Sequence, residues 1–264
     1  MNRPRLFVTK SLLLTLLIAC ASIFSFGARG KVYAQRGKVY EQQQQPSSQK
    51  LYETAKRQFE SGSHGQALET LEGLLKGEPD YAPALLLKAK TLIGLFVDAP
   101  PLLPHEQKSP EALRERKLRQ ARLMKAAAES LERFLQLKPD VERAASLQRQ
   151  LDSLRVYAEP ASKPESEWTF LLPAEATEKA RFIRRPEPRY PEEARSSRLR
   201  GKAKLLMVLA ADSTVKHILV LQSSHPLFTE SALEAARGIV FEPAIKDGLP
   251  VSTAVAVEYT FHTY

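Results

Sequence analysis

Cysteine is almost absent from this chain of 264 residues, in which Cys20 is the only one. An intramolecular disulfide is therefore excluded, and so is a zinc site built from several thiolates. Histidine is scarce as well, and its spacing suits neither a metal site nor a general base with a partner. The five histidines are His64, His105, His217, His225 and His262.

Sequence motifs of catalysis are also lacking. The chain contains no nucleophile elbow, no phosphate-binding glycine loop and no zinc-protease motif. The acidic pairs Glu69/Glu72 and Glu129/Glu132 have the spacing of one solvated helix face, and Asp247-Gly248 is typical of a turn. We therefore expect a protein that is not an enzyme and that has no catalytic residue, no cofactor and no metal site.

The formal net charge of +9 is concentrated at one end of the chain. Residues 1–40 carry seven basic and no acidic side chains. Because these residues surround the most apolar segment of the sequence, they are typical of targeting rather than of phosphate binding. A nucleic-acid partner is not expected.

Residues 1–34 have the pattern of an export segment. Arg3, Arg5 and Lys10 precede an apolar run from Ser11 to Phe26. A polar, glutamine-rich spacer follows at 35–47. The pattern predicts a place in the cell envelope of a Gram-negative bacterium, in the periplasm.

Three fates of this segment remain open. Val32-Tyr33-Ala34 before Gln35 is a cleavage pattern, which gives a soluble periplasmic protein. The sequence Leu17-Ile18-Ala19-Cys20 fits a lipoprotein box, in which Cys20 is lipidated. The segment can also stay as an uncleaved anchor, although its run is shorter than the roughly 20 residues that span a bilayer comfortably.

The middle of the chain contains a helical repeat. Two segments align at an offset of 60, and each has a small residue, an apolar ladder and a Pro-Asp pair. The nine residues Ala67, Glu69, Leu71, Glu72, Leu75, Pro79, Asp80, Ala84 and Leu87 recur as Ala127, Glu129, Leu131, Glu132, Leu135, Pro139, Asp140, Ala144 and Leu147. This pattern resembles the second helix and turn of a tetratricopeptide repeat.

The repeats predict a short helical array at 48–158 whose ligand is an unknown protein. An insertion at 97–122 interrupts it, and a basic helix begins at Pro110 within that insertion. A closing helix is expected from Val141 to Tyr157. A linker at 159–180 follows, and its apolar stretch 168–172 is expected to pack against the rest of the protein.

The C-terminal part, 181–264, shows a series of landmarks. Arg189-Tyr190-Pro191 precedes a short charged helix that ends at Leu199-Arg200-Gly201. Period-two runs at 203–209, 215–221 and 251–261 predict strands, and apolar residues at 3.6-residue spacing predict a helix over 227–239. Asp212-Ser213, Ser223-Ser224, Phe241-Glu-Pro-Ala244 and Asp247-Gly-Leu-Pro-Val251 lie between these elements.

In this order and spacing the landmarks resemble the TonB C-terminal domain family. The resemblance implies a small antiparallel three-stranded sheet with two helices on one face, so the whole chain is α+β. Two departures are visible: Ser213 stands at the usual glycine of the strand turn, and Ile239 at the usual tryptophan. Ser213 makes a tight two-residue turn unfavourable, because a positive φ suits glycine or asparagine better.

The resemblance implies a TonB-like energy transducer that supports transmembrane transport. Its C-terminal domain is expected to bind the plug peptide of an outer-membrane transporter by adding a strand to its last strand. The expected partner-binding residues are Arg189, Tyr190, Pro191, Thr253, Val255 and Val257. An inner-membrane motor complex is a further implied partner, although residues 11–26 lack the histidine that family anchors carry.

A second interpretation is a passive periplasmic adaptor, in which the repeat array and the C-terminal domain each hold a partner during envelope assembly. The N-terminus distinguishes the two functions. Energy transduction requires a retained anchor, whereas an adaptor functions after cleavage or lipidation.

Overall fold

The structure is a computed structural model that describes residues 47–101 and 103–262. The expected export segment 1–34, with Cys20, and all but the last residue of the spacer 35–47 lie outside the described residues. None of the helices in the described ranges combines the length and apolarity that crossing a bilayer requires.

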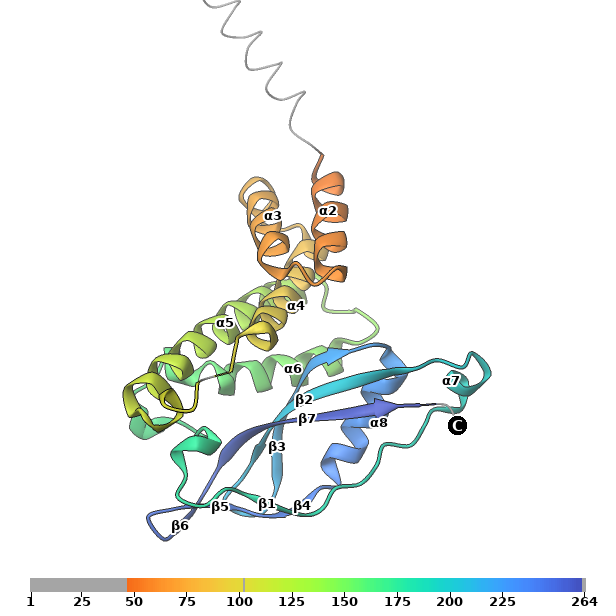
Figure 1. Cartoon of the computed structure of the whole chain (residues 1–264). Helices are drawn as coiled ribbons and strands as arrows, with labels where there is room; N and C mark the ends of the chain where they lie inside the picture. Colours follow the sequence, from red (N-terminus) through yellow and green to blue (C-terminus); the bar gives the residue numbers. More distant parts are fainter. Residues whose placement is uncertain (1–46, 102, 263–264) are drawn as a thin grey trace, which may run out of the picture. The chain divides into compact units, whose positions relative to one another are not determined.

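Five helices form the first part of the described chain (Figure 1). Consecutive helices from α3 onward pack against each other, and α5 is the longest. Proline opens two of them: Pro83 lies in the first turn of α4, and Pro110 begins α5 after Ser109, whose hydroxyl accepts a hydrogen bond from the amide of Ala112. The bounds are α2 (Ser48–Glu60), α3 (His64–Gly77), α4 (Ala82–Asp98), α5 (Pro110–Leu137) and α6 (Ala144–Tyr157), with a short 3-10 turn η1 (Glu106–Lys108) before α5.

Two pairs of equivalent positions, 67/127 and 71/131, are buried in both repeats. Ala67, Leu71 and Ala127 have 0% exposure, and Leu131 has 3%. The insertion does not form a helix of its own, because its basic helix continues without a break into the second repeat as α5. The closing helix begins at Ala144, three residues later than expected. The resemblance to tetratricopeptide repeats itself stays a prediction.

A three-stranded antiparallel sheet in the order β3-β2-β7 forms the C-terminal part (Figure 1). Its strands overlap the three expected period-two runs, although the last strand begins at Thr253, two residues later than expected, and α8 overlaps the expected helix. Two small strand pairs, β1–β4 and β5–β6, were not predicted. The bounds are β1 (Arg181–Arg184), α7 (Glu192–Ser196), β2 (Gly201–Leu209), β3 (Val215–Ser223), α8 (Pro226–Arg237), β4 (Val240–Glu242), β5 (Ala244–Lys246), β6 (Leu249–Val251) and β7 (Thr253–Phe261).

Both faces of this sheet are covered: α8 lies on one face, as expected of the C-terminal part, and the helical part covers the other. Alternate residues of β2 point to opposite faces. Leu205 and Met207 belong to a core with Phe228 of α8, which we call the α8-side core. Leu206 and Val208 belong instead to a core with residues of α4, α5 and α6, which we call the helix-side core. The helical part and the sheet therefore share apolar side chains within the compact unit 51–264.

The linker 159–180 is fastened to α5 by a buried ion pair. Lys117 has 2% side-chain exposure, and its ammonium nitrogen lies 3.0 Å from Oε2 of Glu175. The same nitrogen is 4.3 Å from the centre of the Trp168 ring. The predicted packing of the apolar stretch 168–172 is thus seen in part, since Phe170 is buried in the helix-side core. Three 3-10 turns, η2 (Glu159–Ala161), η3 (Glu165–Glu167) and η4 (Pro173–Glu175), shape the linker.

The turn between β2 and β3 explains how serine replaces glycine at position 213. Ser213 has φ of 62°, in the left-handed region that favours glycine. The amide of Ser213 bonds to the carbonyl of Ala210, and the amide of Ala210 bonds to the carbonyl of Thr214. The loop is therefore a three-residue one with a left-handed last residue, and not a tight two-residue turn. Asp212 accepts a hydrogen bond from the amide of Thr214 and steadies this loop.

Ser213→Gly is expected to stabilise the protein by about 0.5–1 kcal/mol. Glycine removes the steric cost of a positive φ, but its greater conformational entropy in the unfolded chain offsets part of this stabilisation. Urea denaturation of the whole chain measures the change. Ala211→Gly, in the same exposed loop at a residue without positive φ, is the control and should not stabilise. Equal stabilisation by both substitutions would contradict the explanation.

Candidate functional site

The outer edge of β7 is the candidate functional site. In the sheet order β3-β2-β7 the strand pairs with β2 on one side only. The amide of Ala254 donates to the carbonyl of Leu171, away from β2. Because main-chain groups alternate along a strand, those of Ala256, Glu258 and Thr260 point to the same outer side. The predicted edge position of the last strand is confirmed.

Two contacts limit this edge. At its start, the linker residue Leu171 pairs with β7 in parallel orientation, and its amide donates to the carbonyl of Ser252 at 2.9 Å. Farther along, the guanidinium of Arg185 donates to the carbonyl of Glu258. No described strand pairs with the outer side between Ala256 and Thr260. The free stretch is thus short, and part of it is held by a side chain instead of a strand.

A cleft of about 580 Å³ lies beside the free stretch. Arg185, Pro186, Pro188 and Tyr190 line one side, and β7 from Glu258 onward lines the other. Proline has no amide hydrogen and cannot donate to a strand ladder. The two prolines therefore prevent residues 185–190 from closing the edge as a regular strand, although these residues run alongside it.

The structure separates the six expected binding residues into two groups. Tyr190 lines the cleft, and its ring lies 6.0 Å from Phe228 and 6.4 Å from Phe261. Its hydroxyl donates to the carbonyl of Leu199, so it also holds the chain entering β2. Arg189 is exposed, and Pro191 is half-buried at the N-cap of α7.

The other three expected residues face the interior. Thr253 has 1% exposure and Val257 has 4%, and Val255 is half-buried against the α8-side core. Their side chains cannot set the register of an incoming peptide, because the sheet and its covering elements enclose them. The exposed side chains of β7 are those of Ala256, Glu258 and Thr260. A role of the strand itself in binding stays a prediction.

Sequence reasoning missed Leu171 and Arg185, the two residues that limit the edge. The apolar stretch around Leu171 indicated packing, but no local signal indicates that it pairs with a strand about 80 residues farther on. Arg185 belongs to a segment with many arginines, and nothing in the sequence distinguishes it from its neighbour Arg184.

The opposite edge of the sheet is closed by side chains of α6. A bulge in β3, with His217 at φ of 51°, turns its carbonyls toward this helix. The carbonyl of His217 accepts from the Tyr157 hydroxyl at 2.8 Å, and the Ser153 hydroxyl donates to the carbonyl of Ile218 at 3.2 Å. Gln150 accepts from the amide of Val220 at 2.7 Å. Its closed edge makes β3 unsuitable for strand addition.

No cluster of histidine, cysteine and acidic residues suitable for a metal occurs in the described ranges. Two histidines have structural contacts instead. Nδ1 of His225 accepts from the amide of Leu227 and caps α8, and Nδ1 of His64 lies 2.5 Å from Oδ2 of Asp98. The chemistry that this site offers is recognition by main-chain hydrogen bonds and by the surfaces of the cleft.

Residues 186–263 match the family model described as Gram-negative bacterial TonB protein C-terminal. The chain is also similar to the solution NMR structure of the TonB C-terminal domain of Pseudomonas aeruginosa, with 25% identity, 32% of this chain and 86% of that chain covered, and a TM-score of 0.29. No curated protein matches the chain. The family match confirms the resemblance inferred from the landmarks, and with the observed strands and helices it confirms the α+β fold of the C-terminal part.

Proposed function

We propose that this protein is a TonB-like transducer or linker of the Gram-negative envelope, which binds outer-membrane transporters in the periplasm and supports transport. The observation that carries the proposal is the free edge of β7 in a segment that matches the TonB C-terminal family. The protein acts without catalysis: an extended plug peptide adds to β7 as a further strand. Coupling to an inner-membrane motor belongs to the same proposal.

The geometry of the edge supports strand addition between Ala256 and Thr260. An incoming strand finds outward main-chain groups there, and it enters the cleft lined by Tyr190 and Pro188. It takes the place of Arg185 on the carbonyl of Glu258, because one amide then donates where the guanidinium donates in the free protein. The guanidinium remains beside the bound peptide and is available to a carboxylate or a carbonyl of it.

The same geometry explains why the last strand is available although the helical part covers one face of the sheet. The helix-side core includes Ala254, near the start of β7, but none of its members comes from the second half of the strand. Toward its C-terminal end, β7 carries buried residues of the α8-side core, including Tyr259 and Phe261. Side chains make the contacts that cover a face of the sheet, whereas main-chain groups make the hydrogen bonds at its edge. A covered face therefore does not prevent pairing at the edge.

Ala256→Pro is expected to weaken capture of transporters strongly while leaving the fold nearly unchanged. The Ala256 amide points outward, so proline removes a donor that only an incoming strand uses, and proline is tolerated at an edge. The measurement places a photo-crosslinker at Thr260 in cells and identifies the crosslinked peptides by mass spectrometry. Loss of one hydrogen bond, with the clash of the ring, is expected to lower the yield about tenfold or more.

Ala256→Ser is the matched control, because serine keeps the amide and should crosslink like the unaltered chain. Crosslinks to transporter plug segments support the proposal. Crosslinks confined to the protein's own α4–α6 would contradict it. Unchanged capture by Ala256→Pro would show that partners bind elsewhere, and would leave a passive adaptor as the better description.

A further inference from the structure

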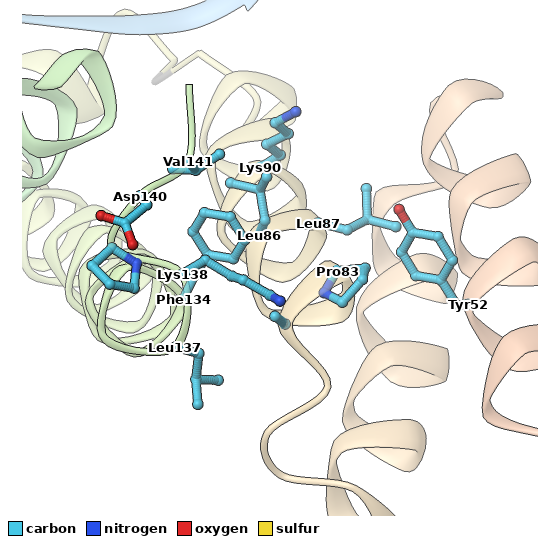
Figure 2. Close-up of a pocket in the computed structure, with 12 residues that line it drawn as sticks. Tyr52, Pro83, Leu86, Leu87, Lys90, Phe134, Leu137, Lys138, Asp140 and Val141 are labelled. Atoms are coloured by element: carbon cyan, nitrogen blue, oxygen red, sulfur yellow. The ribbon is translucent and has the colours of Figure 1, made fainter. Parts of the chain in front are cut away.

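An apolar groove of about 670 Å³ lies in the helical part, far along the sequence from β7. Side chains from α2, α4 and the end of α5 line it, together with the turn that precedes α6 (Figure 2). Its apolar surface comes from Leu86 and Leu87 of α4, Phe134 and Leu137 of α5, and Val141. Leu87 and Phe134 are buried, but Leu86, Leu137 and Val141 are only half-buried and line an open surface.

Two lysines border this surface at separate places. Lys90 projects from α4, and Lys138 follows the last residue of α5. In Figure 2 their ammonium ends lie apart, with the side chains of the groove between them. The one acidic residue in the lining, Asp140, forms no ion pair with any described residue. Partial burial lowers the pKa of the Lys90 ammonium group, and the nearby guanidinium of Arg143, a third cation, lowers it further.

Two other cations on the same helices have acidic partners within the chain. Lys88 of α4 lies 3.4 Å from a carboxylate oxygen of Glu72, and Arg133 of α5 lies 2.6 Å from one of Asp80. Among the described residues, by contrast, none of Lys90, Lys138 and Arg143 has an acidic side chain within ion-pair distance. The three cations at the groove therefore have no acidic partner among the described residues and are available to carboxylates of a ligand.

We propose that this groove binds an acidic peptide segment of another protein, in which carboxylates alternate with large apolar side chains. The apolar side chains fill the surface between Leu86 and Leu137, and the carboxylates supply the missing partners of Lys90 and Lys138. Because the two ammonium groups are separated, the ligand needs negative charge at more than one place along its length. A peptide meets that need, whereas a fatty acid has one carboxylate at its end.

The proposal gives the helical part a binding role of its own, independent of strand addition at β7. The partner class is defined by charge and apolar surface rather than by an extended main chain. The protein then holds two different peptides at once, one by main-chain pairing and one by side-chain complementarity. A failure of either site leaves the other unaffected.

Fluorescence anisotropy of the whole chain with a labelled probe peptide tests this site. The probe is Gly-Glu-Leu-Glu-Glu-Phe-Leu-Glu-Gly, and its control has glutamine in place of every glutamate. The acidic probe is expected to bind saturably below about 1 mM, and the glutamine control at least about tenfold more weakly. Raising the salt concentration should weaken binding of the acidic probe, because its ion pairs are at the surface.

The double variant Lys90→Gln/Lys138→Gln is expected to bind the acidic probe about tenfold more weakly, since two exposed ion pairs are lost. The matched control is Lys88→Gln, which removes a cation from the same helix but from outside the groove, and which should bind like the unaltered chain. Circular dichroism of both variants verifies that the helices are retained.

Three results would overturn the proposal. The first is unchanged affinity of the double variant for the acidic probe, or equal binding of both peptides. The second is a dimer in light scattering that dissociates in the double variant, which would assign the groove to a second copy of the chain. The third is binding of anionic phosphatidylglycerol vesicles, lost in the double variant, without any binding of the acidic probe.

Discussion

Leu131→Asp is expected to unfold the helical part and the sheet together, whereas Leu71→Asp is expected to unfold only the first helices. Leu131 has 3% exposure and belongs to the helix-side core, which also contains Leu206, Val208 and Leu219 of the sheet. Leu71 has 0% exposure but lies in a separate cluster with Ala55, Leu74 and Ala84. Burying an unpaired carboxylate costs several kcal/mol, comparable to the whole stability of a small domain.

Hydrogen exchange read by mass spectrometry distinguishes the two outcomes segment by segment. In Leu71→Asp, peptides from α2 and α3 should lose protection while those from β2 and β7 keep it. In Leu131→Asp, peptides from α4, α5 and the sheet should lose protection together. Gln136→Asp places the same charge on an exposed residue of α5 and is the control. A sheet that stays protected in Leu131→Asp would show that the shared core contributes little.

Glu175→Gln is expected to destabilise the protein by about 3 kcal/mol, because it leaves the Lys117 ammonium buried without its anionic partner. The glutamine keeps the size of the side chain, so the loss reports charge and not packing. Urea denaturation near pH 7 gives the change in the free energy of unfolding. The linker 165–175 should also gain hydrogen exchange, because the ion pair fastens it to α5.

Adding Lys117→Met to Glu175→Gln should restore most of this stability, since methionine fills the space beside Trp168 and Phe170 without a charge. Failure of the second substitution to rescue the first would mean that Glu175 acts mainly through its hydrogen bond to the Leu172 amide. The single variant Lys117→Met completes the double-mutant cycle, which gives the interaction free energy between the two side chains.

The free energy of unfolding depends on pH through the Lys117–Glu175 pair, and the direction of this dependence follows from the pKa of Lys117. Burial lowers the pKa of Lys117, and the Glu175 carboxylate opposes that shift. Between the lowered native pKa and the ordinary value of 10.5, the unfolded chain binds the proton that the folded chain has released. Stability from this group therefore rises with pH across that window, and Glu175→Gln extends the window downward.

Several elements were predictable because their signals are local. The alternation of Ala203, Leu205, Met207 and Leu209 predicted β2, and the three period-two runs predicted all strands of the main sheet. Gly201 was recognised as a landmark, and the structure gives its reason: a Cβ there would lie 2.5 Å from Cβ of Ser224.

Other features depend on contacts between distant segments, for which a single sequence holds no local signal. Leu206 and Val208 made β2 apolar on both sides, which is typical of a strand covered on both faces, but the identity of the covering helices does not follow from the strand. The same holds for Gln150 of α6, which accepts a hydrogen bond from β3 but whose side chain resembles that of any exposed helix residue. The groove cations Lys90 and Lys138 are recognisable only once their neighbours are known.

The bulged strand β3 and the three α6 side chains that cap it determine how many partners the sheet can accept. A sheet open on both sides can add strands at each end, and identical molecules then extend into ribbons of unlimited length. In the described part of the chain, the β3 edge is occupied by α6, so the proposed strand addition is confined to the β7 edge. A peptide that pairs with β7, as proposed, therefore finds no second free edge on this three-stranded sheet.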